Sequence, residues 1–321
     1  MTHTLQLQLT IPGSQRGQRL DRALAELVQD YSRSRLQQWI RAGQVTLDGR
    51  VPPVRERVQG GELVRIDAEL VEQTASLPEA IPLDIVHEDA ELLVINKPAG
   101  LVVHPAVGNP AGTLMNALLH HDPALAGLPR AGIVHRLDKN TTGLMVVART
   151  LTAHKRLVDA LQARTVKREY LTVVNTVLTA GGCIEAPLGR HPVDRKRMAV
   201  VSGGKEAITH YRVVERYRAH TLLQVRLETG RTHQIRVHMA YQRCPVVGDP
   251  VYGGRLRLPR GASVALREAL ANFRRQALHA ARLELVHPGS GALVSWEAHV
   301  PDDMEQLITV LREDARQQHD T

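Results

Sequence analysis

The sequence predicts an α+β protein with a small N-terminal domain and a larger C-terminal domain built on a mainly antiparallel, mixed sheet. Its 321 residues are enough for two hydrophobic cores. Strand-like segments mostly follow one another instead of alternating with helices, which disfavours a doubly wound fold. A Pro-containing stretch short of large apolar groups separates the two parts. We therefore place the domains at 16–70 and 83–321, with a linker at 71–82.

The N-terminal domain is expected to begin with two amphipathic helices. Their apolar residues are Leu20, Ala23, Leu24 and Leu27 in the first helix and Leu36, Trp39 and Ile40 in the second, which the Ser32/Ser34 region can cap. Val45–Leu47 then predicts a strand, Asp48-Gly49 is typical of a two-residue hairpin turn, and a final strand follows Gly60-Gly61. Between Arg16 and Arg65, ten Arg against six acidic residues give this unit a local charge of +4.

The C-terminal domain has the patterning of several strands and a few helices. Strands are expected at 83–87, 92–95, 170–174, 208–214, 222–227, 282–285 and 293–298, and helices at 114–121, 153–162, 232–241 and 304–312. The last helix carries Met304, Leu307, Ile308 and Leu311 on one face, which is typical of core packing.

The composition favours a polyanionic partner. The formal net charge is +8, and Arg, whose planar fork suits phosphates, supplies most of the positive charge. Aromatic residues make up only 3% of the chain, so a sheet platform that stacks successive bases is not expected. The two cysteines lie far apart in the sequence, and no apolar run is long enough to span a membrane, which together predict a cytoplasmic protein.

The common motifs for cofactors and hydrolytic nucleophiles do not occur. The sequence has no GxxxxGK[ST] loop, no strand-linked GxGxxG, no HExxH and no GxSxG. Its sixteen His are not spaced as a ligand array, and most are expected to be surface or capped side chains. An enzyme with this sequence is therefore expected to work without a metal, a nucleotide or a redox cofactor.

One carboxylate stands out in the stretch from Gly132 to Ala148. Two apolar, strand-like runs flank the polar segment His135-Arg136-Leu137-Asp138-Lys139-Asn140-Thr141-Thr142. Burial of the flanks would hold Asp138 rigidly on a loop that can face a substrate. Taken alone, however, a single Asp in a basic loop is more often part of an ordinary turn.

The chain resembles the RluA family of pseudouridine synthases in four ordered motifs. His135-Arg136-Leu137-Asp138 with Gly143 is similar to the family's catalytic motif, and Asn96-Lys97-Pro98-Ala99-Gly100 to its first motif. Lys167-Arg168-Glu169-Tyr170 matches the segment that ends in an active-site Tyr, and the run from Thr229 to His238 matches the third motif. The N-terminal domain resembles the S4 RNA-binding module through Arg19-Leu20-Asp21, Ser32-Arg33-Ser34 and Gly43 to Gly49.

The resemblance implies an isomerase that converts uridine to pseudouridine, with three catalytic residues. Asp138 would be the catalytic carboxylate, and it could attack C1′, add to C6 of the base or abstract a sugar proton. Arg236 would pair with Asp138, because a nearby guanidinium favours a charged carboxylate. Tyr170 would stack on the target uracil.

The same resemblance implies how the RNA is held. Arg136 would insert into the RNA where the uridine has left the stack, and Ile235 would line the base pocket, unless it only packs the helix. Lys97 is expected at the pocket floor. Contacts with RNA or base are also expected from His135 and, in the N-terminal domain, from Arg33 and Arg35. The implied partner is 23S ribosomal RNA or the large ribosomal subunit, with a loop uridine of helix 69 as target, and the implied enzyme is a monomer without a cofactor.

Three alternatives differ from this interpretation. A related synthase could act on transfer RNA or on another ribosomal site. A non-catalytic ribosome-assembly factor would be favoured if Asp138 or Arg236 were replaced, and neither is. An RNA hydrolase would need a second carboxylate, a metal cluster or a His pair beside Asp138, where only His135 is found.

Overall fold

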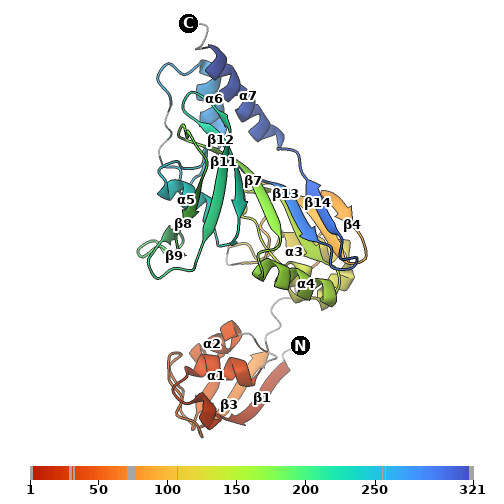
Figure 1. Ribbon diagram of the computed structural model, residues 1–321. Helices are drawn as coiled ribbons and strands as arrows, with labels where there is room; N and C mark the ends of the chain where they lie inside the picture. Colours follow the sequence, from red (N-terminus) through yellow and green to blue (C-terminus); the bar gives the residue numbers. More distant parts are fainter. Residues whose placement is uncertain are drawn as a thin grey trace. The chain divides into compact units, whose positions relative to one another are not determined.

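The computed structural model divides into two compact units, Met1–Ala75 and Ser76–Thr321 (Figure 1). It describes residues 3–28, 31, 33–70, 77–106, 108–254, 256 and 258–317. Ser32, part of the expected cap, and half of the expected linker, 71–76, lie outside the described residues. No helix of the described residues is long and apolar enough to cross a membrane.

The N-terminal unit is a three-stranded antiparallel sheet with two helices. Its elements are β1 (His3–Thr10), a 3₁₀ turn (Gly13–Gln15), α1 (Leu20–Leu27), α2 (Arg33–Arg41), β2 (Val45–Leu47) and β3 (Leu63–Leu70), with the sheet in the order β1-β3-β2. The unit begins before the expected start at residue 16, because β1 pairs with β3 along its whole length. The alternating Leu5, Leu7 and Leu9 pack against the unit's core and fix the face of β1 that points inward.

The turn expected at Asp48-Gly49 is present, but it does not join two neighbouring strands of the sheet. Both residues have positive φ, 49° and 82°, and Leu47 and Arg50 exchange backbone hydrogen bonds across them. The chain then leaves the sheet, and β2 pairs with β3 instead. Asp48 connects the turn to that partner, since its carboxylate accepts a hydrogen bond from the Leu63 amide at 2.8 Å.

A buried carboxylate joins the two helices of the N-terminal unit. The Asp21 side chain on α1 is fully buried, and it accepts hydrogen bonds from Arg33 of α2 at 2.9 and 2.8 Å, from Arg19, and from Gln37. Burial alone would raise the pKa of Asp21, but these donors outweigh it and lower the pKa to about 2. The Arg33 guanidinium is thus held at one edge while nearly half of the side chain stays exposed.

We predict that Asp21→Asn destabilises the N-terminal unit by about 2 kcal/mol, because the buried charge and one of the two acceptor oxygens that serve Arg19, Arg33 and Gln37 are replaced by an NH2 donor. Hydrogen–deuterium exchange of the α1 and α2 amides in the full chain measures this directly. Glu26→Gln is the matched control, since its carboxylate is 49% exposed in its pair with Arg22 and is expected to change exchange little. Equal protection in Asp21→Asn and the wild type would contradict the role of Asp21.

The large unit contains one nine-stranded sheet in the order β4-β5-β6-β13-β7-β12-β11-β8, with β14 also paired to β13. Its strands are β4 (Ile85–Glu88), β5 (Leu92–Lys97), β6 (Thr142–Ala148), β7 (Lys167–Val174), β8 (Gly182–Glu185), β11 (Ile208–Arg216), β12 (Thr221–Leu227), β13 (Leu278–Val286) and β14 (Leu293–Glu297). All pairings are antiparallel except that of β6 with β13. The expected mainly antiparallel, mixed sheet is therefore confirmed.

Helices and short strands complete this unit. They are α3 (Leu114–His121), α4 (Leu151–Gln162), α5 (Gln234–Tyr241), α6 (Val264–Asn272) and α7 (Asp302–Gln317), 3₁₀ turns at Pro123–Gly127 and Pro129–Gly132, and a hairpin of β9 (Leu188–Arg190) and β10 (Met198–Val200). The four expected helices are confirmed, with α7 longer than expected. The nine-residue α6 and the short strands β8 to β10 were not expected; β8 to β10 have only three or four residues each and so show little periodicity.

The two faces of the sheet carry different helices (Figure 1). Alternate residues of β5 and β6 enter different cores: Leu93 and Met145 pack with α3, whereas Leu92 and Leu144 pack with α4. Since successive strand residues point to opposite faces, α3 and α4 cover opposite sides. β6 is buried along its whole length, which explains its continuous apolar run.

Part of the expected linker belongs structurally to the large unit. The backbone of Glu79 donates to the Asn116 carbonyl of α3 at 3.1 Å, and the Asn116 side chain donates to the Leu77 carbonyl at 2.8 Å. Ile81 packs against the large core. Residues 77–82 are therefore held along α3 and do not form a free connection.

Candidate active site

Asp138 lies on the loop that precedes β6, and the chain fixes that loop on both sides. Leu137 is buried, and the two threonines that follow Asp138 bind the start of β13: Thr141 accepts from Gln276 at 2.9 Å, and Thr142 contacts His279 at 2.9 Å. The Asp138 side chain itself is 16% exposed. It is thus a carboxylate on an anchored loop with part of its surface open.

Glycine is required where this loop enters the sheet. Gly143 pairs with Ala280 in the parallel ladder between β6 and β13, and its φ is +111°. A Cβ at this position would lie 2.3 Å from the Ala280 carbonyl oxygen. Ala280 also pairs with Tyr170 of β7, so this close approach brings the Asp138 loop to the strand that carries Tyr170.

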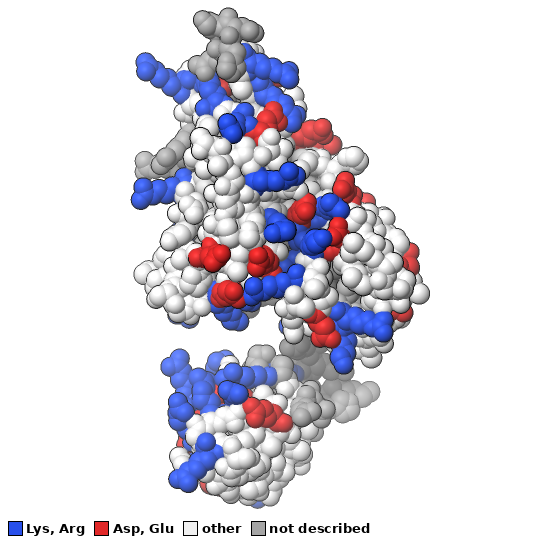
Figure 2. Space-filling view, viewed as in Figure 1, with Lys and Arg blue, Asp and Glu red and all other residues white. Residues whose placement is uncertain are grey.

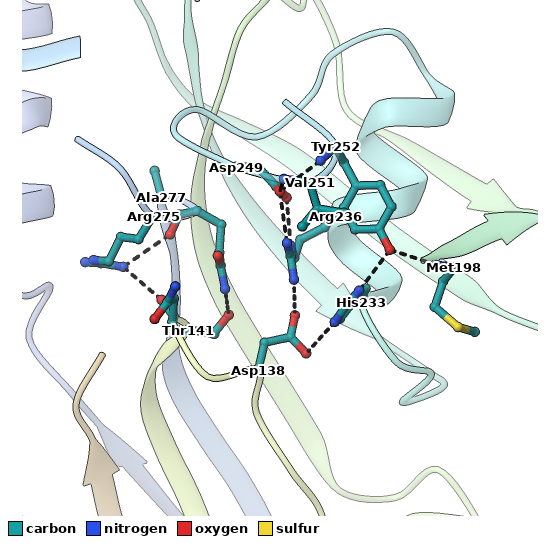
Figure 3. A network of polar contacts seen from close by, with 12 residues as sticks. Asp138, Thr141, Met198, His233, Arg236, Asp249, Val251, Tyr252, Arg275 and Ala277 are labelled. Atoms are coloured by element: carbon teal, nitrogen blue, oxygen red, sulfur yellow. Dashed lines mark hydrogen bonds and ion pairs between the residues drawn. The ribbon is translucent and has the colours of Figure 1, made fainter. Parts of the chain in front are cut away.

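Arg236 projects from α5 and binds two carboxylates at once (Figure 3). Its Nη1 donates to Asp138 Oδ2 at 2.9 Å, while Nε and Nη2 donate to the two oxygens of Asp249 at 2.7 and 2.9 Å. Burial opposes the charged form, but Asp249 and Asp138 outweigh it and raise the pKa of the guanidinium. The contact expected between Arg236 and Asp138 is present.

Asp249 is a site residue that the sequence analysis did not single out. Its side chain is fully buried, and besides Arg236 it accepts hydrogen bonds from the amides of Val251 and Tyr252 at 2.8 and 3.0 Å. Burial raises its pKa, but the hydrogen bonds and charge of Arg236 lower it overall. Its pairing with Arg236, thirteen residues away in the sequence, has no local periodicity that could have indicated it.

His233 and Tyr252 form a second contact to Asp138 that was also missed. The Tyr252 hydroxyl accepts from the Met198 amide at 2.9 Å and lies 2.8 Å from His233 Nδ1 (Figure 3). We infer that the hydroxyl donates its hydrogen to Nδ1, so that Nε2 carries the ring proton. Nε2 lies 3.8 Å from Asp138 Oδ1. Burial lowers the pKa of His233 and so favours the neutral ring, although the charge of Asp138 acts in the opposite direction.

Gln234 and His238 hold α5 in place. Gln234 accepts from Thr229 and from the Arg231 amide at 2.8 and 3.0 Å, and donates to the Ile208 carbonyl at 3.0 Å. His238 contacts the Thr209 hydroxyl at 2.8 Å and the Ala186 carbonyl at 2.9 Å. Gln234 and His238 therefore anchor α5, the helix that presents Arg236.

Tyr170 is buried, with 6% of its surface exposed, in the middle of the sheet. Burial raises the pKa of its hydroxyl, Arg168 opposes this rise, and Asp138 adds to it. The phenol therefore lies within electrostatic reach of Asp138, on the strand that the pairing with Ala280 brings beside Gly143.

Lys97 is buried behind the Asp138 loop and binds its backbone at Lys139. It is 1% exposed, and its ammonium donates to the carbonyls of Pro98, Leu101 and Lys139 at 2.7, 3.0 and 3.0 Å. Burial lowers its pKa to about 7, although the charge of Asp138 acts in the opposite direction. Lys97, expected at the pocket floor, thus holds the Asp138 loop through hydrogen bonds within the chain, and its contact with RNA stays a prediction.

The other expected RNA contacts differ in how open they are. His135 uses Nε2 to accept from the Val146 amide at 3.0 Å, and burial lowers the pKa of the ring to about 3, so the neutral ring supports β6. Its expected contact with RNA or base stays a prediction. Ile235 is buried in the large core at the start of α5, and Arg136 is exposed beside Asp138. Arg33 and Arg35 belong to the N-terminal unit, where the Arg35 guanidinium lies 5.6 Å from the centre of the Trp39 ring.

Charged side chains of both signs mark the surface of the large unit, whereas blue side chains dominate one side of the N-terminal unit (Figure 2). Exposed arginines of that unit include Arg16, Arg22, Arg41, Arg55 and Arg57. In the described part of the chain, no group of three or more His, Cys, Asp or Glu side chains could hold a metal ion.

We predict that Asp249→Ala destabilises the large unit by about 3 kcal/mol, because the buried Arg236 loses its two-point partner. Asp303→Ala is the matched control: Asp303 forms the same two-point pair with Arg275, but its side chain is 51% exposed, so a loss of about 1 kcal/mol or less is expected. Urea unfolding of the two variants compares them. Similar losses in both would show that burial of the carboxylate does not matter.

Comparisons with known proteins agree with this geometry. Residues 91–241 match the family model described as RNA pseudouridylate synthase, and residues 18–64 match the S4 domain. A protein of Escherichia coli strain K12 called "Ribosomal large subunit pseudouridine synthase D" is 55% identical over 100% of this chain and 98% of its own length. A protein of the same name from Xanthomonas campestris pv. campestris is 55% identical over 96% of this chain and 93% of its own.

Solved structures are similar in the same region. The structure of "Human RNA Pseudouridylate Synthase Domain Containing 4" has 27% identity and a TM-score of 0.56, and covers 71% of this chain and 92% of its own. "Human RNA Pseudouridylate Synthase Domain Containing 1", with 24% identity and a TM-score of 0.53, shares the fold.

Proposed function

Because the chain belongs to the RNA pseudouridylate synthase family, with an S4 domain at its N-terminus, we propose that it converts uridine to pseudouridine in 23S RNA of the large ribosomal subunit. The observation that carries this proposal is the buried Arg236, held by Asp249, with its Nη1 bound to the partly open Asp138. The names of the two relatives, each matched over nearly the whole chain, support the choice of RNA.

The reaction needs few chemical groups. The bond between N1 of uracil and C1′ of ribose breaks, the base rotates, and a bond forms between C5 and C1′. The C5 proton leaves to solvent and N1 gains a proton, so nothing is oxidised and no water is consumed. A carboxylate beside the sugar and a pocket that retains the freed uracil are sufficient.

Asp138 is the proposed catalytic carboxylate, through attack on C1′, addition to C6 or abstraction of a sugar proton. Arg236 binds Oδ2 and thereby fixes the carboxylate, while Oδ1 faces the Nε2–H of His233 at a longer distance of 3.8 Å. With both carboxylates ionised, Asp138, Arg236 and Asp249 carry one net negative charge.

The remaining roles concern the substrate. Tyr170 would stack on the uracil, Ile235 would line the base pocket, and the exposed Arg136 would occupy the space that the flipped uridine leaves. Flipping costs least where the base is already outside a duplex, which favours a loop uridine, and helix 69 is the loop we propose. The basic N-terminal unit, with Arg33 and Arg35, would add phosphate contacts that position the RNA. Because one chain supplies both units, we propose that it acts as a monomer, in the cytoplasm where ribosomal RNA is found.

We predict that Asp138→Asn lowers turnover at least about 1,000-fold, since the amide can neither attack nor accept a proton as the carboxylate does. Release of tritium from RNA labelled at uridine C5 measures turnover. Asp303→Asn, which changes an exposed carboxylate of α7, should release tritium at the wild-type rate. Equal release by Asp138→Asn and the wild type would remove Asp138 from the chemistry.

We also predict that deletion of residues 1–75 weakens RNA binding and reduces its dependence on salt, because the basic unit releases counterions when it binds phosphates. Titration of a ribosomal RNA fragment at several salt concentrations gives both quantities, and circular dichroism checks that the remaining unit is folded. An unchanged affinity and salt slope would mean that the S4 domain does not contact this RNA.

A further inference from the structure

Arg168 is a buried cation that the proposed chemistry leaves unexplained. It lies on β7 and is only 8% exposed, and its Nε is buried without a hydrogen-bond partner. No residue that the structure describes forms an ion pair or a hydrogen bond with its guanidinium. Because a buried charge is normally paired, this arrangement is unfavourable in the free protein and points to a partner that arrives from outside.

Three of the family motifs surround this side chain. Arg168 stands two residues before Tyr170, so both point to the same face of β7. Its charge acts on both Tyr170 and His135. Gly230, from the segment that leads to α5, leaves room for the guanidinium, because a Cβ there would lie 2.8 Å from Arg168 Nη1. The unpaired cation therefore lies beside the proposed base-stacking Tyr.

The neighbouring carboxylates are used elsewhere. Asp138 and Asp249 bind Arg236. Glu169 follows Arg168 directly and so points to the opposite face of β7, where it accepts from Gln224. The missing counter-charge must therefore come from the substrate.

We propose that Arg168 binds a non-bridging oxygen of a phosphate that flanks the target uridine, a role that rests on the proposed function. The RNA brings a full negative charge at every phosphate, and a guanidinium can bind two of its oxygens. A uracil carbonyl is neutral before the reaction and would leave the buried cation without a counter-charge in the ground state. The phosphate keeps its charge through the reaction, so Arg168 can hold the nucleotide while the base detaches and rotates.

The test compares the wild type, Arg168→Gln, Arg168→Lys and the control Arg226→Gln. Arg226 lies on the neighbouring strand β12, opposite Glu169, and is exposed. The substrate is a ribosomal RNA hairpin whose uridine the wild type converts, made with normal phosphates or with a neutral methylphosphonate on either side of that uridine. Tritium release by the wild type comes first, because its absence would refute the proposed function without any bearing on Arg168.

We expect Arg168→Gln to weaken binding of the normal RNA at least about tenfold and to lower the slope of log affinity against log salt by about one, as loss of one phosphate contact requires. One of the two methylphosphonates should weaken the wild type to a similar extent and leave Arg168→Gln unchanged. Arg168→Lys should keep most of the salt slope, and Arg226→Gln should behave as the wild type.

Thermal unfolding separates this role from a structural one. A residue that stabilises the fold would lower the melting temperature when replaced, whereas removal of an unpaired buried charge should leave it unchanged or raise it. The proposal is overturned if Arg168→Gln binds RNA with the wild-type affinity and salt slope. It is also overturned if both methylphosphonates weaken the variant as much as the wild type, which would assign the guanidinium to the base.

Discussion

The site depends on one interaction, the binding of the Arg236 guanidinium to two carboxylates at once. The buried Asp249 takes two of its nitrogens and is itself fixed by two backbone amides, so the third nitrogen can point in only one direction, towards Asp138. Each partner comes from a different part of the chain: the loop before β6, α5, and the segment after α5. The ion pairs therefore connect three separate segments around one charge, and the burial of Arg236 makes the loss of any partner costly.

That geometry requires the sheet to bring the Asp138 loop to its middle. The single parallel pairing, between β6 and β13, does this, and it is possible because Gly143 has no side chain to collide with Ala280. Lys97 then ties the loop to the turn after β5 through three carbonyls, two on its own turn and one at Lys139. Residues that look suited to RNA contact in the sequence, Lys97 and His135, thus hold the backbone that presents Asp138.

Features that depend on local sequence could be predicted, whereas contacts between distant segments could not. The main helices and the longer strands follow from periodicity, and Asp138, Arg236 and Tyr170 follow from their motifs. Asp249, His233 and Tyr252 could not be assigned in the same way, because their roles depend on side chains that meet only after the chain has folded. The missed β1 has a clear alternation of Leu5, Leu7 and Leu9, but its partner β3 lies some sixty residues further along the chain. Whether a buried cation spends its hydrogen bonds within the chain, as Lys97 does, is likewise a property of the folded state.

The same physical device occurs in both units. In the N-terminal unit the buried Asp21 holds Arg19 and Arg33 at one edge and leaves the rest of Arg33 exposed; in the large unit the buried Asp249 holds Arg236 and directs its remaining nitrogen to Asp138. In both units a carboxylate in the core thus sets the direction of a guanidinium. Arg suits this arrangement because its planar guanidinium can bind the buried carboxylate through some nitrogens and direct another nitrogen elsewhere. A Lys ammonium has all its donors on one nitrogen. Both positions therefore require the shape of the side chain as much as its charge.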